Sequence, residues 1–325
     1  MNAKRKKVIS DNIIWLILIA LVILMSIANR NFATMANLKT LLTGEAIKGI
    51  MAFGVAFAML TKGIDLSIGA VAALVGAVTG GLVQPVDLAT RAFPGGAHFA
   101  VPLSILLGIL IGAAIGACIG ALVAYTHIPA FIATLGAQLI CRAGAKMVSN
   151  RPVSNLPDAY RFMGSKQFFG IPMIVIVFIV IAILAWFILK HTRFGMSLYA
   201  LGGNAQAATV AGINVEKTLV KVYIWCSVMA ALGGILLAGR SGSSDPSTSG
   251  IGYELDAIAA ATVGGTSHSG GVCTISGVIA GILIMGVINN GLVLMGVDDN
   301  MTNICKGIII IGSVIVDMRK NIQKI

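Results

Sequence analysis

Two apolar runs, residues 41–60 and 66–83, are separated by the polar segment Lys62-Gly63-Ile64-Asp65-Leu66-Ser67. Each run approaches the roughly 20 residues that a helix needs to cross a bilayer. Because the hydrocarbon core holds no water, a spanning segment must satisfy its own backbone polar groups, and both runs therefore predict helices. Asp65 is placed to accept hydrogen bonds from N–H groups of the helix that follows. The segment predicts a helix that restarts inside the membrane or at its rim.

The same apolar character extends over the whole chain. Of its 325 residues, 57% are hydrophobic and 11% are charged, and the mean hydropathy is +0.95, whereas soluble chains carry roughly 25% charged residues. Further apolar runs lie at residues 13–28, 101–125, 130–148, 171–189, 219–238, 257–263 with a glycine-rich continuation, 277–295 and 301–316. We expect an all-α integral membrane protein with about ten transmembrane helices, some broken or re-entrant. Residues 1–325 then form a single transmembrane domain.

The composition also excludes several kinds of site. The net charge is +11, but the basic residues are scattered and only 6% of residues are aromatic, so we expect no nucleic-acid partner. The five cysteines lack CxxC spacing and the four histidines lack HxxxH pairing, which predicts neither a disulfide framework nor a metal site. The chain contains no phosphate-binding GxxxxGK[ST] loop and no GxSxG nucleophile motif. We therefore expect no catalytic residue and no ATP hydrolysis by this chain.

The basic residues predict the orientation, since Lys and Arg near the ends of spans are retained on the cytoplasmic side. One cluster, Lys4 to Lys7, precedes the first run, and Arg319, Lys320 and Lys324 follow the last run. Both termini are then cytoplasmic and the number of crossings is even. Ten crossings also place the loop at residues 190–221 in the cytoplasm, with its basic residues Lys190, Arg193, Lys217 and Lys221.

Small residues recur at helical spacing in two of the runs. Gly112, Gly116 and Gly120 are each four residues apart, and Gly277 and Gly281 repeat this spacing. Such stripes let two helix backbones approach closely in lipid. We interpret both as packing seams rather than as pore linings.

Four acids lie in apolar surroundings: Glu45, Asp65, Glu254 and Asp256. Charged groups within a span are costly, so each is a functional candidate, although an acid near a helix start also caps it. For Asp65, with Ser67 as its helper, a capping role and contact with a solute both stay open, and the two are compatible. Glu254 and Asp256 face different ways on a helix, so they cannot flank one scissile bond. Stabilisation of a helix N-terminus is the simpler interpretation of that pair.

The loop at residues 190–221 carries a further pattern. Its stretch from Ala200 to Ile213 predicts a short amphipathic helix between glycines. A small-residue helix on the cytoplasmic face suits a groove in a partner protein, and an ordinary surface helix is the alternative.

At these places the chain closely resembles the permease subunits of bacterial ABC sugar importers, in the branch that carries ribose, galactose, xylose and related monosaccharides. The resemblance spans nearly the whole chain. It rests on residues 63–67 (GIDLS), 129–136 (PAFIATLG), 202–204 (GGN) with 207–208 and 212–213, and 253–260 (YELDAIAA) with 264–267 (GGTS). Several long motifs in the same order make it specific.

The resemblance implies a division of labour. Two copies of this chain would form the pore in the bacterial inner membrane, in contact with lipid. ABC ATPase subunits would bind inside, and a periplasmic or lipoprotein sugar-binding protein would deliver the substrate outside. The chain itself would hold no cofactor, since ATP would be bound by the partner. Glu254 and Asp256 would serve structural or gating roles.

Residues 206–212 look like the Glu-Ala-Ala-x-x-x-Gly coupling motif with which ABC permeases dock on their ATPases. The implied ATPase-coupling residues are Gly202, Gly203, Asn204, Gln206, Ala207, Ala208 and Gly212. Gln206 replaces the acid of the motif, which removes one potential ion pair and leaves the docking inference standing.

A neutral sugar needs partners for its hydroxyl groups, and we expect a weak pathway because a tight pocket would hinder release. The pathway candidates are Asp65, Ser67, Thr134, Asn289 and Asn290. One alternative is a stand-alone secondary carrier driven by protons through Asp65 or Glu45. Another keeps the ABC arrangement with autoinducer-2 or a sugar alcohol as cargo.

Overall fold

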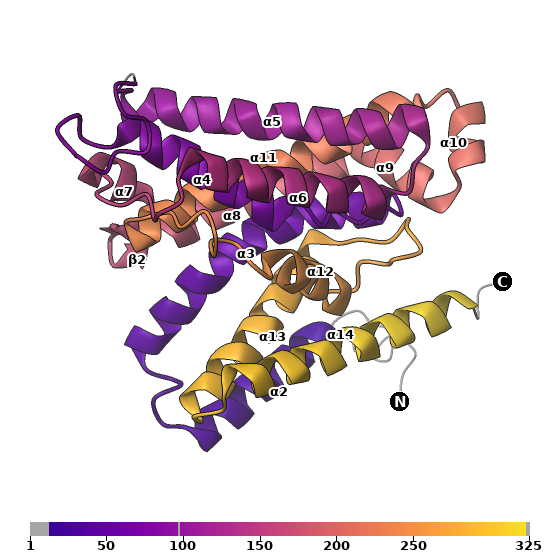
Figure 1. Ribbon diagram of the computed structural model, residues 1–325. Coiled ribbons are helices and arrows are strands. Elements are labelled where there is room, and N and C mark those ends of the chain that lie inside the picture. The colour runs from indigo at the N-terminus through magenta and orange to yellow at the C-terminus, as the bar shows by residue number, and fades with distance from the viewer. Residues whose placement is uncertain (1–12, 97, 323–325) are drawn as a thin grey trace.

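The computed structural model describes residues 13–96 and 98–322, so the basic cluster at residues 4–7 and Lys324 lie outside the described residues (Figure 1). The regular secondary structure of the described chain is helical apart from one small hairpin. Its helices are α2 Ile13–Ala28, α3 Met35–Leu60, α4 Ile68–Val83, α5 Val101–Thr126, α6 Ala130–Val148, α7 Asp158–Ser165, α8 Met173–His191, α9 Arg193–Gly203, α10 Ala205–Val210, α11 Val215–Ser241, α12 Tyr253–Val263, α13 Ile275–Leu294 and α14 Asp299–Ile322.

Every apolar run of the sequence coincides with one of these helices, which confirms a helical membrane protein. Within the described ranges, seven helices are long and apolar enough to cross a membrane, namely α3, α5, α6, α8, α11, α13 and α14. The apolar helices α2 and α4 are shorter, with 16 residues each, and α12 has only 11.

Two sequence expectations need correction. The run predicted from residue 171 begins as a helix only at Met173, because Ile171–Pro172 forms strand β2, which pairs with strand β1, Gln167–Phe168. The single helix expected within residues 200–213 is two helices, α9 and α10. They are separated at Asn204, whose extended backbone ends one helix and caps the next.

Helix α11 lies at the centre of the core and packs against α3, α4 and α5. The predicted glycine seam of α5 faces it. A Cβ atom added at Gly112 would lie 2.9 Å from the Ser227 carbonyl oxygen, and one at Gly120 would lie 2.6 Å from Val220 Cα. At Gly116 it would overlap the backbone of Tyr223. The seam predicted from the spacing is thus confirmed, and α5 lies backbone to backbone against α11.

The second predicted seam is confirmed as well. A Cβ atom at Gly277 would overlap the Gly264 carbonyl, and one at Gly281 would overlap the Ala260 carbonyl. Helix α13 therefore packs closely on α12. Helix α13 also contacts α2 and α3, and these contacts connect the α12–α13 pair to the rest of the molecule. Figure 1 shows α2, α13 and α14 together on one side of the bundle that contains α5 and α11.

Helices α4 and α12 both begin in the interior, and their N-termini meet. A Cβ atom at Gly69 would overlap the Gly250 carbonyl and a carboxylate oxygen of Glu254. Each helix is preceded by a non-helical stretch, residues 61–67 and 242–252. The first is held by the Thr134 hydroxyl, which donates to the Ile64 carbonyl at 3.1 Å, and the second by Arg142, which donates to the Ser249 carbonyl at 2.7 Å. The restart predicted at Asp65 is therefore confirmed, and α12 repeats it.

The bundle has two distinct ends. At one, which we call the α10 end, Leu60 accepts a hydrogen bond from the Gly271 N–H at 3.0 Å, and His268 donates to Asp317 at 3.0 Å. The other, which we call the hairpin end, carries β1 and β2, and there Lys39 donates to Gln167 at 3.2 Å. The last turns of α14 thus lie at the same end as α9 and α10 (Figure 1).

We predict that Gly116→Ala destabilises the protein by about 1–3 kcal/mol, because the added methyl group overlaps backbone atoms that cannot rotate away. Thermal unfolding of the detergent-solubilised protein measures the effect. Gly136→Ala in α6 is the matched control, since no atom lies within 4 Å of a Cβ added there. Equal melting temperatures for the two variants would contradict the close packing of α5 on α11.

Candidate functional site

The break before α4 is built around Asp65, which is fully buried. Its Oδ1 accepts hydrogen bonds from the Ser67 N–H at 2.9 Å and from the Ser67 hydroxyl at 2.6 Å. Asp65 thus forms a turn immediately ahead of the helix. It does not accept from N–H groups of α4 itself, as the sequence had suggested, because its partner Ser67 is the N-cap residue and α4 begins at Ile68. Among the described residues, Oδ2 has no hydrogen-bond partner, and neither do the buried hydroxyls of Tyr223 and Ser227 on α11.

Ser67 and Thr134 are also fully buried beside Asp65. Thr134 donates to Ile64 and so fastens α6 to the break. These three pathway candidates are brought together, but they are enclosed by protein. The other two, Asn289 and Asn290, lie on α13 and line a cavity elsewhere in the molecule.

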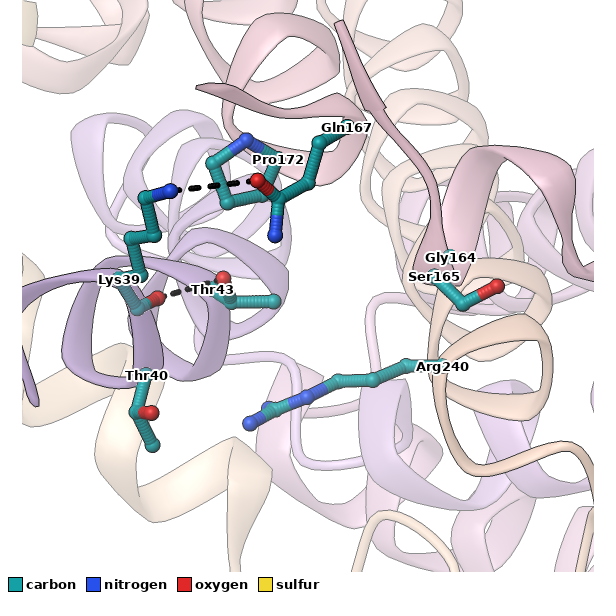
Figure 2. Close-up of a pocket in the computed structure, with 8 residues that line it drawn as sticks. All are labelled: Lys39, Thr40, Thr43, Gly164, Ser165, Gln167, Pro172 and Arg240. Atoms are coloured by element: carbon teal, nitrogen blue, oxygen red, sulfur yellow. Dashed lines mark hydrogen bonds between the residues drawn. The ribbon is translucent and has the colours of Figure 1, made fainter. Parts of the chain in front are cut away.

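That cavity consists of two adjoining hollows of about 270 Å³ each, which share Thr40 and Arg240. The outer hollow opens toward the hairpin end, and Figure 2 shows Arg240 extending from α11 toward the residues of α3. It is lined by Lys39, Thr40, Thr43, Gly164, Ser165, Gln167, Pro172 and Arg240. The inner hollow lies among α3, α11, α12 and α13. It is lined by Thr40, Leu41, Gly44, Glu45, Lys48, Arg240, Tyr253, Gly286, Asn289, Asn290 and Val293.

Two of these side chains have unused hydrogen-bonding capacity. Within the part of the chain that the structure describes, neither the Arg240 guanidinium nor the Asn289 amide makes a hydrogen bond or an ion pair. Asn290, by contrast, exchanges two hydrogen bonds with Asn37 at 2.8 and 2.9 Å, which ties α13 to α3. The inner hollow therefore offers free donors beside a fixed amide pair.

A network of charges closes the inner hollow at its deep side. Lys48 lies 3.2 Å from Glu45 and 2.8 Å from Asp256, and Asp256 lies 3.2 Å from Lys306. The side chains are 11–17% exposed, so water screens them little and each charge needs its partner. The network joins α3, α12 and α14. It confirms that Glu254 and Asp256 face different ways, since Glu254 lies against α4 instead.

The α9–α10 elbow, residues 193–213, forms the second candidate site. Its tip is exposed: from Gly203 to Gly212 only Ala208 is buried, and Val210 is 90% exposed. The Asn204 side chain caps α10 by accepting from the Ala207 N–H at 3.0 Å. Gly212 closes the elbow with a backbone φ of +83°, a conformation that glycine adopts without strain. Gly202, by contrast, is buried against the Leu60 carbonyl at the end of α3.

Next to the elbow lies the loop at residues 264–274. The Ser267 hydroxyl and the His268 N–H both donate to Asp317 of α14, each at 3.0 Å. Burial lowers the pKa of His268, and the Asp317 carboxylate opposes this shift. His268 and the Thr262 hydroxyl are 2.9 Å apart, which fastens the loop back onto α12. The end of α3, the elbow and the loop are thus one packed unit.

Sequence reasoning missed Lys48, Arg240 and Lys306 as members of the site. Lys48 follows Glu45 by three residues inside an apolar span, and opposite charges at this spacing share a helix face. That spacing was the available signal. Arg240 and Lys306 carried none, because the hollow that Arg240 lines and the partner of Lys306 are formed by distant parts of the sequence.

The arrangement suits the passage of a solute and the docking of a partner protein rather than catalysis. Among the described residues, no group of three or more His, Cys, Asp and Glu side chains is placed to hold a metal ion. The spanning helices, the polar cavity between them and the exposed elbow define a polytopic membrane permease.

Comparison with known proteins identifies the family. Residues 37–314 match the family described as the permease component of the branched-chain amino acid transport system, and the chain belongs to this family. The resemblance to ABC sugar permeases is confirmed by curated relatives. The chain is 41% identical to the ribose import permease protein RbsC of Bacillus subtilis (strain 168), over 94% of this chain and 91% of the relative.

Two relatives from Escherichia coli (strain K12) agree. The ribose import permease protein RbsC is 39% identical over 93% of both chains, and the galactose/methyl galactoside import permease protein MglC is 36% identical over the full length of both. No solved structure matches the chain.

We predict that Asp256→Asn destabilises the protein by about 3–5 kcal/mol, because Lys48 and Lys306 lose their shared carboxylate in a poorly hydrated site. Thermal unfolding in detergent measures the change. Asp158→Asn is the control: Asp158 is 92% exposed and lies 4.0 Å from Arg161, a surface pair that contributes at most about 1 kcal/mol. Equal stability of the two variants would show that the network is not needed for folding.

Proposed function

We propose that this chain is the pore-forming subunit of an ATP-driven ABC importer for a monosaccharide, non-catalytic in itself and resident in the bacterial inner membrane. The exposed, capped helix α10 carries the proposal, because a spanning bundle that presents a small helix at one end has a surface ready for a partner groove. The relatives' names, which specify ribose and galactose import, support a monosaccharide as the cargo.

The direction of the helices supports ten crossings. Eight are α2, α3, α5, α6, α8, α11, α13 and α14, and two are the interrupted segments that contain α4 and α12. The α10 end is then cytoplasmic, because the basic residues Lys62, Lys190, Arg193, Lys217, Lys221 and Arg319 gather there. The first and last described residues, 13 and 322, then lie toward the same side, and the hairpin end faces the binding protein.

The coupling mechanism follows from what the elbow touches. ATP-driven closure of two ATPase subunits would displace α10, and Gly202 passes that motion to the end of α3, where it packs on the Leu60 carbonyl. Helix α11 begins beside the elbow and carries Arg240 at its other end, beside the cavity. Rigid shifts of α3 and α11 would alternate access to the cavity between the two sides. Two copies of the chain would enclose the complete pore.

The five pathway candidates have separate places in this mechanism. Asn289 and Asn290 both line the cavity, where Asn289 is proposed to contact the sugar and Asn290 to hold α13 against α3. Asp65, Ser67 and Thr134 form a buried unit at the break before α4, and they are proposed to face the pathway only after the helices shift. Glu254 and Asp256 are proposed as gating residues, because the first lies between α4 and α12 and the second lies in the charge network.

Reconstitution into liposomes tests the function. We expect uptake of labelled D-ribose or D-galactose only when the ATPase, the binding protein and ATP are present together. Uptake by this polypeptide alone under a pH gradient, insensitive to ATP, would establish a proton-coupled carrier instead. ATP-driven uptake of autoinducer-2 or a sugar alcohol, with no uptake of either monosaccharide, would support an ABC importer but contradict a monosaccharide as its cargo.

We predict that Val210→Asp abolishes co-purification of the ATPase and reduces ATP-driven uptake at least tenfold, since a charge on the exposed tip of α10 opposes docking in an apolar groove. Val86→Asp, at an exposed position near the hairpin end, is the matched control and retains the ATPase. The variant Gly212→Asp is also expected to uncouple transport, but its residue 212 has a positive φ, so it strains the turn as well. Full activity of Val210→Asp would reject the docking assignment.

A further inference from the structure

The inner hollow has a composition that the proposed function leaves unexplained. A passage for solutes needs only a polar wall, yet this hollow brings two free donors, Arg240 and Asn289, to one place where neither has a hydrogen-bond partner within the described chain. A half-buried charged or amide donor without a partner favours the binding of a ligand that accepts a hydrogen bond from it.

Most of the charges around the hollow are already paired with each other. Lys48 and Lys306 are balanced by Glu45 and Asp256, so the network contributes no net charge. Arg240 is the one further charge on the lining of the inner hollow. The lining also contains acceptors, because Glu45 and the asparagine amides present oxygens. Each hydroxyl group both donates and accepts, so a wall that mixes the two kinds of atom suits a polyhydroxylated molecule better than a simple anion.

The size and shape agree with this ligand class. The hollow of about 270 Å³ is just below the roughly 300–1,000 Å³ range of sites for larger small molecules. Tyr253 adds an aromatic surface, and its ring already lies 5.7 Å from Lys48 Nζ. An aromatic ring offers an apolar face beside polar groups, which matches the C–H face of a sugar ring.

The position of the hollow relates it to transport. Along α3, Lys39 and Thr40 lie nearest the hairpin end, while Glu45 and Lys48 lie about one and a half to two and a half turns deeper. Lys48 is 12 residues from the helix end at Leu60, or about 18 Å along its axis. A ligand entering from the hairpin end would therefore pass Arg240 and rest on the Lys48–Asp256 pair, about halfway along the helix.

We propose that the inner hollow is a low-affinity monosaccharide-binding site on the translocation path, with Arg240 and Asn289 donating to sugar hydroxyls and the Lys48–Asp256–Lys306 network forming its floor. The proposal rests on the proposed function and adds the contact residues. Asn290 positions α13 through its pair with Asn37, and it is not a free donor.

Protection of an introduced thiol tests occupancy directly. Thr40 lines both hollows and is exposed, so Thr40→Cys is accessible to a hydrophilic maleimide and preserves the size of the side chain. The assembled permease–ATPase complex in nanodiscs is labelled without binding protein, in the presence of D-ribose, D-galactose or inorganic phosphate at millimolar concentrations. We expect at least one sugar to slow labelling threefold or more, with no effect of phosphate. Val86→Cys, also exposed near the hairpin end, is expected to react at the same rate throughout.

Donor variants in the Thr40→Cys background identify the contacts. Arg240→Gln is expected to raise the half-protecting sugar concentration about tenfold or more, and Asn289→Ala about two- to tenfold, as the loss of a charge-assisted and a neutral hydrogen bond predicts. The matched controls are Arg151→Gln and Asn303→Ala, at exposed positions away from the cavity, and they are expected to leave it unchanged.

The outcomes separate this inference from the proposed function. Absence of sugar protection in a complex that still imports monosaccharide with ATP and binding protein would overturn the binding site alone. Protection by phosphate without protection by sugar would overturn it in favour of an anion site, and unchanged half-protecting concentrations in both donor variants would remove Arg240 and Asn289 from it. If a donor variant fails to assemble, Thr40→Cys protection by itself decides the proposal. A complex that imports neither sugar would instead refute the proposed function.

Discussion

The fold depends on one constraint, which is that a backbone in hydrocarbon must find its hydrogen-bond partners within the protein. Two segments of the bundle meet this constraint without being continuous helices. The stretches before α4 and α12 are enclosed by the bundle, and their carbonyl groups are bonded by Thr134 and Arg142 from α6. Asp65 adds a carboxylate that accepts from Ser67 at the first break. Interrupted helices are thereby possible in the interior of the bundle, and the polar groups that they expose toward each other come from sequence segments nearly 200 residues apart.

Close packing of helix α11 connects the two functional regions. The glycines of α5 bring its backbone against α11, which leaves little freedom for sliding at that contact. With 27 residues, α11 is about 40 Å long, and it extends from the elbow to the cavity. The close packing of α12 on α13 likewise restricts helix sliding at the side of the cavity near Asp256. Motion at the α10 end would then reach the cavity as rigid shifts of whole helices rather than as local bending.

Much of this organisation was predictable because hydrophobic runs and glycine spacing are local properties of the chain. Every apolar run became a helix, both glycine stripes became seams, and the restart at Asp65 is present. The separation of α9 from α10 escaped prediction because Asn204 resembles any polar residue within a small-residue stretch until its extended backbone is seen. The cavity escaped it as well, since its lining comes from α3, α11, α12 and α13, and no local pattern reports which faces of distant helices meet.

By itself, the sequence determined that this chain is a helical membrane protein without a nucleotide-binding loop, and its motifs identified the permease family. Those properties follow from hydropathy and from short-range order, which each segment carries independently of its neighbours. Only the tertiary structure decided that Lys48, Asp256 and Lys306 form one network, that Arg240 and Asn289 line one hollow, and that Asp65 is buried away from it. The physical reason is that a charged side chain within a membrane needs an oppositely charged partner. Helix packing decides which residue supplies that partner, and this residue can be distant in the sequence.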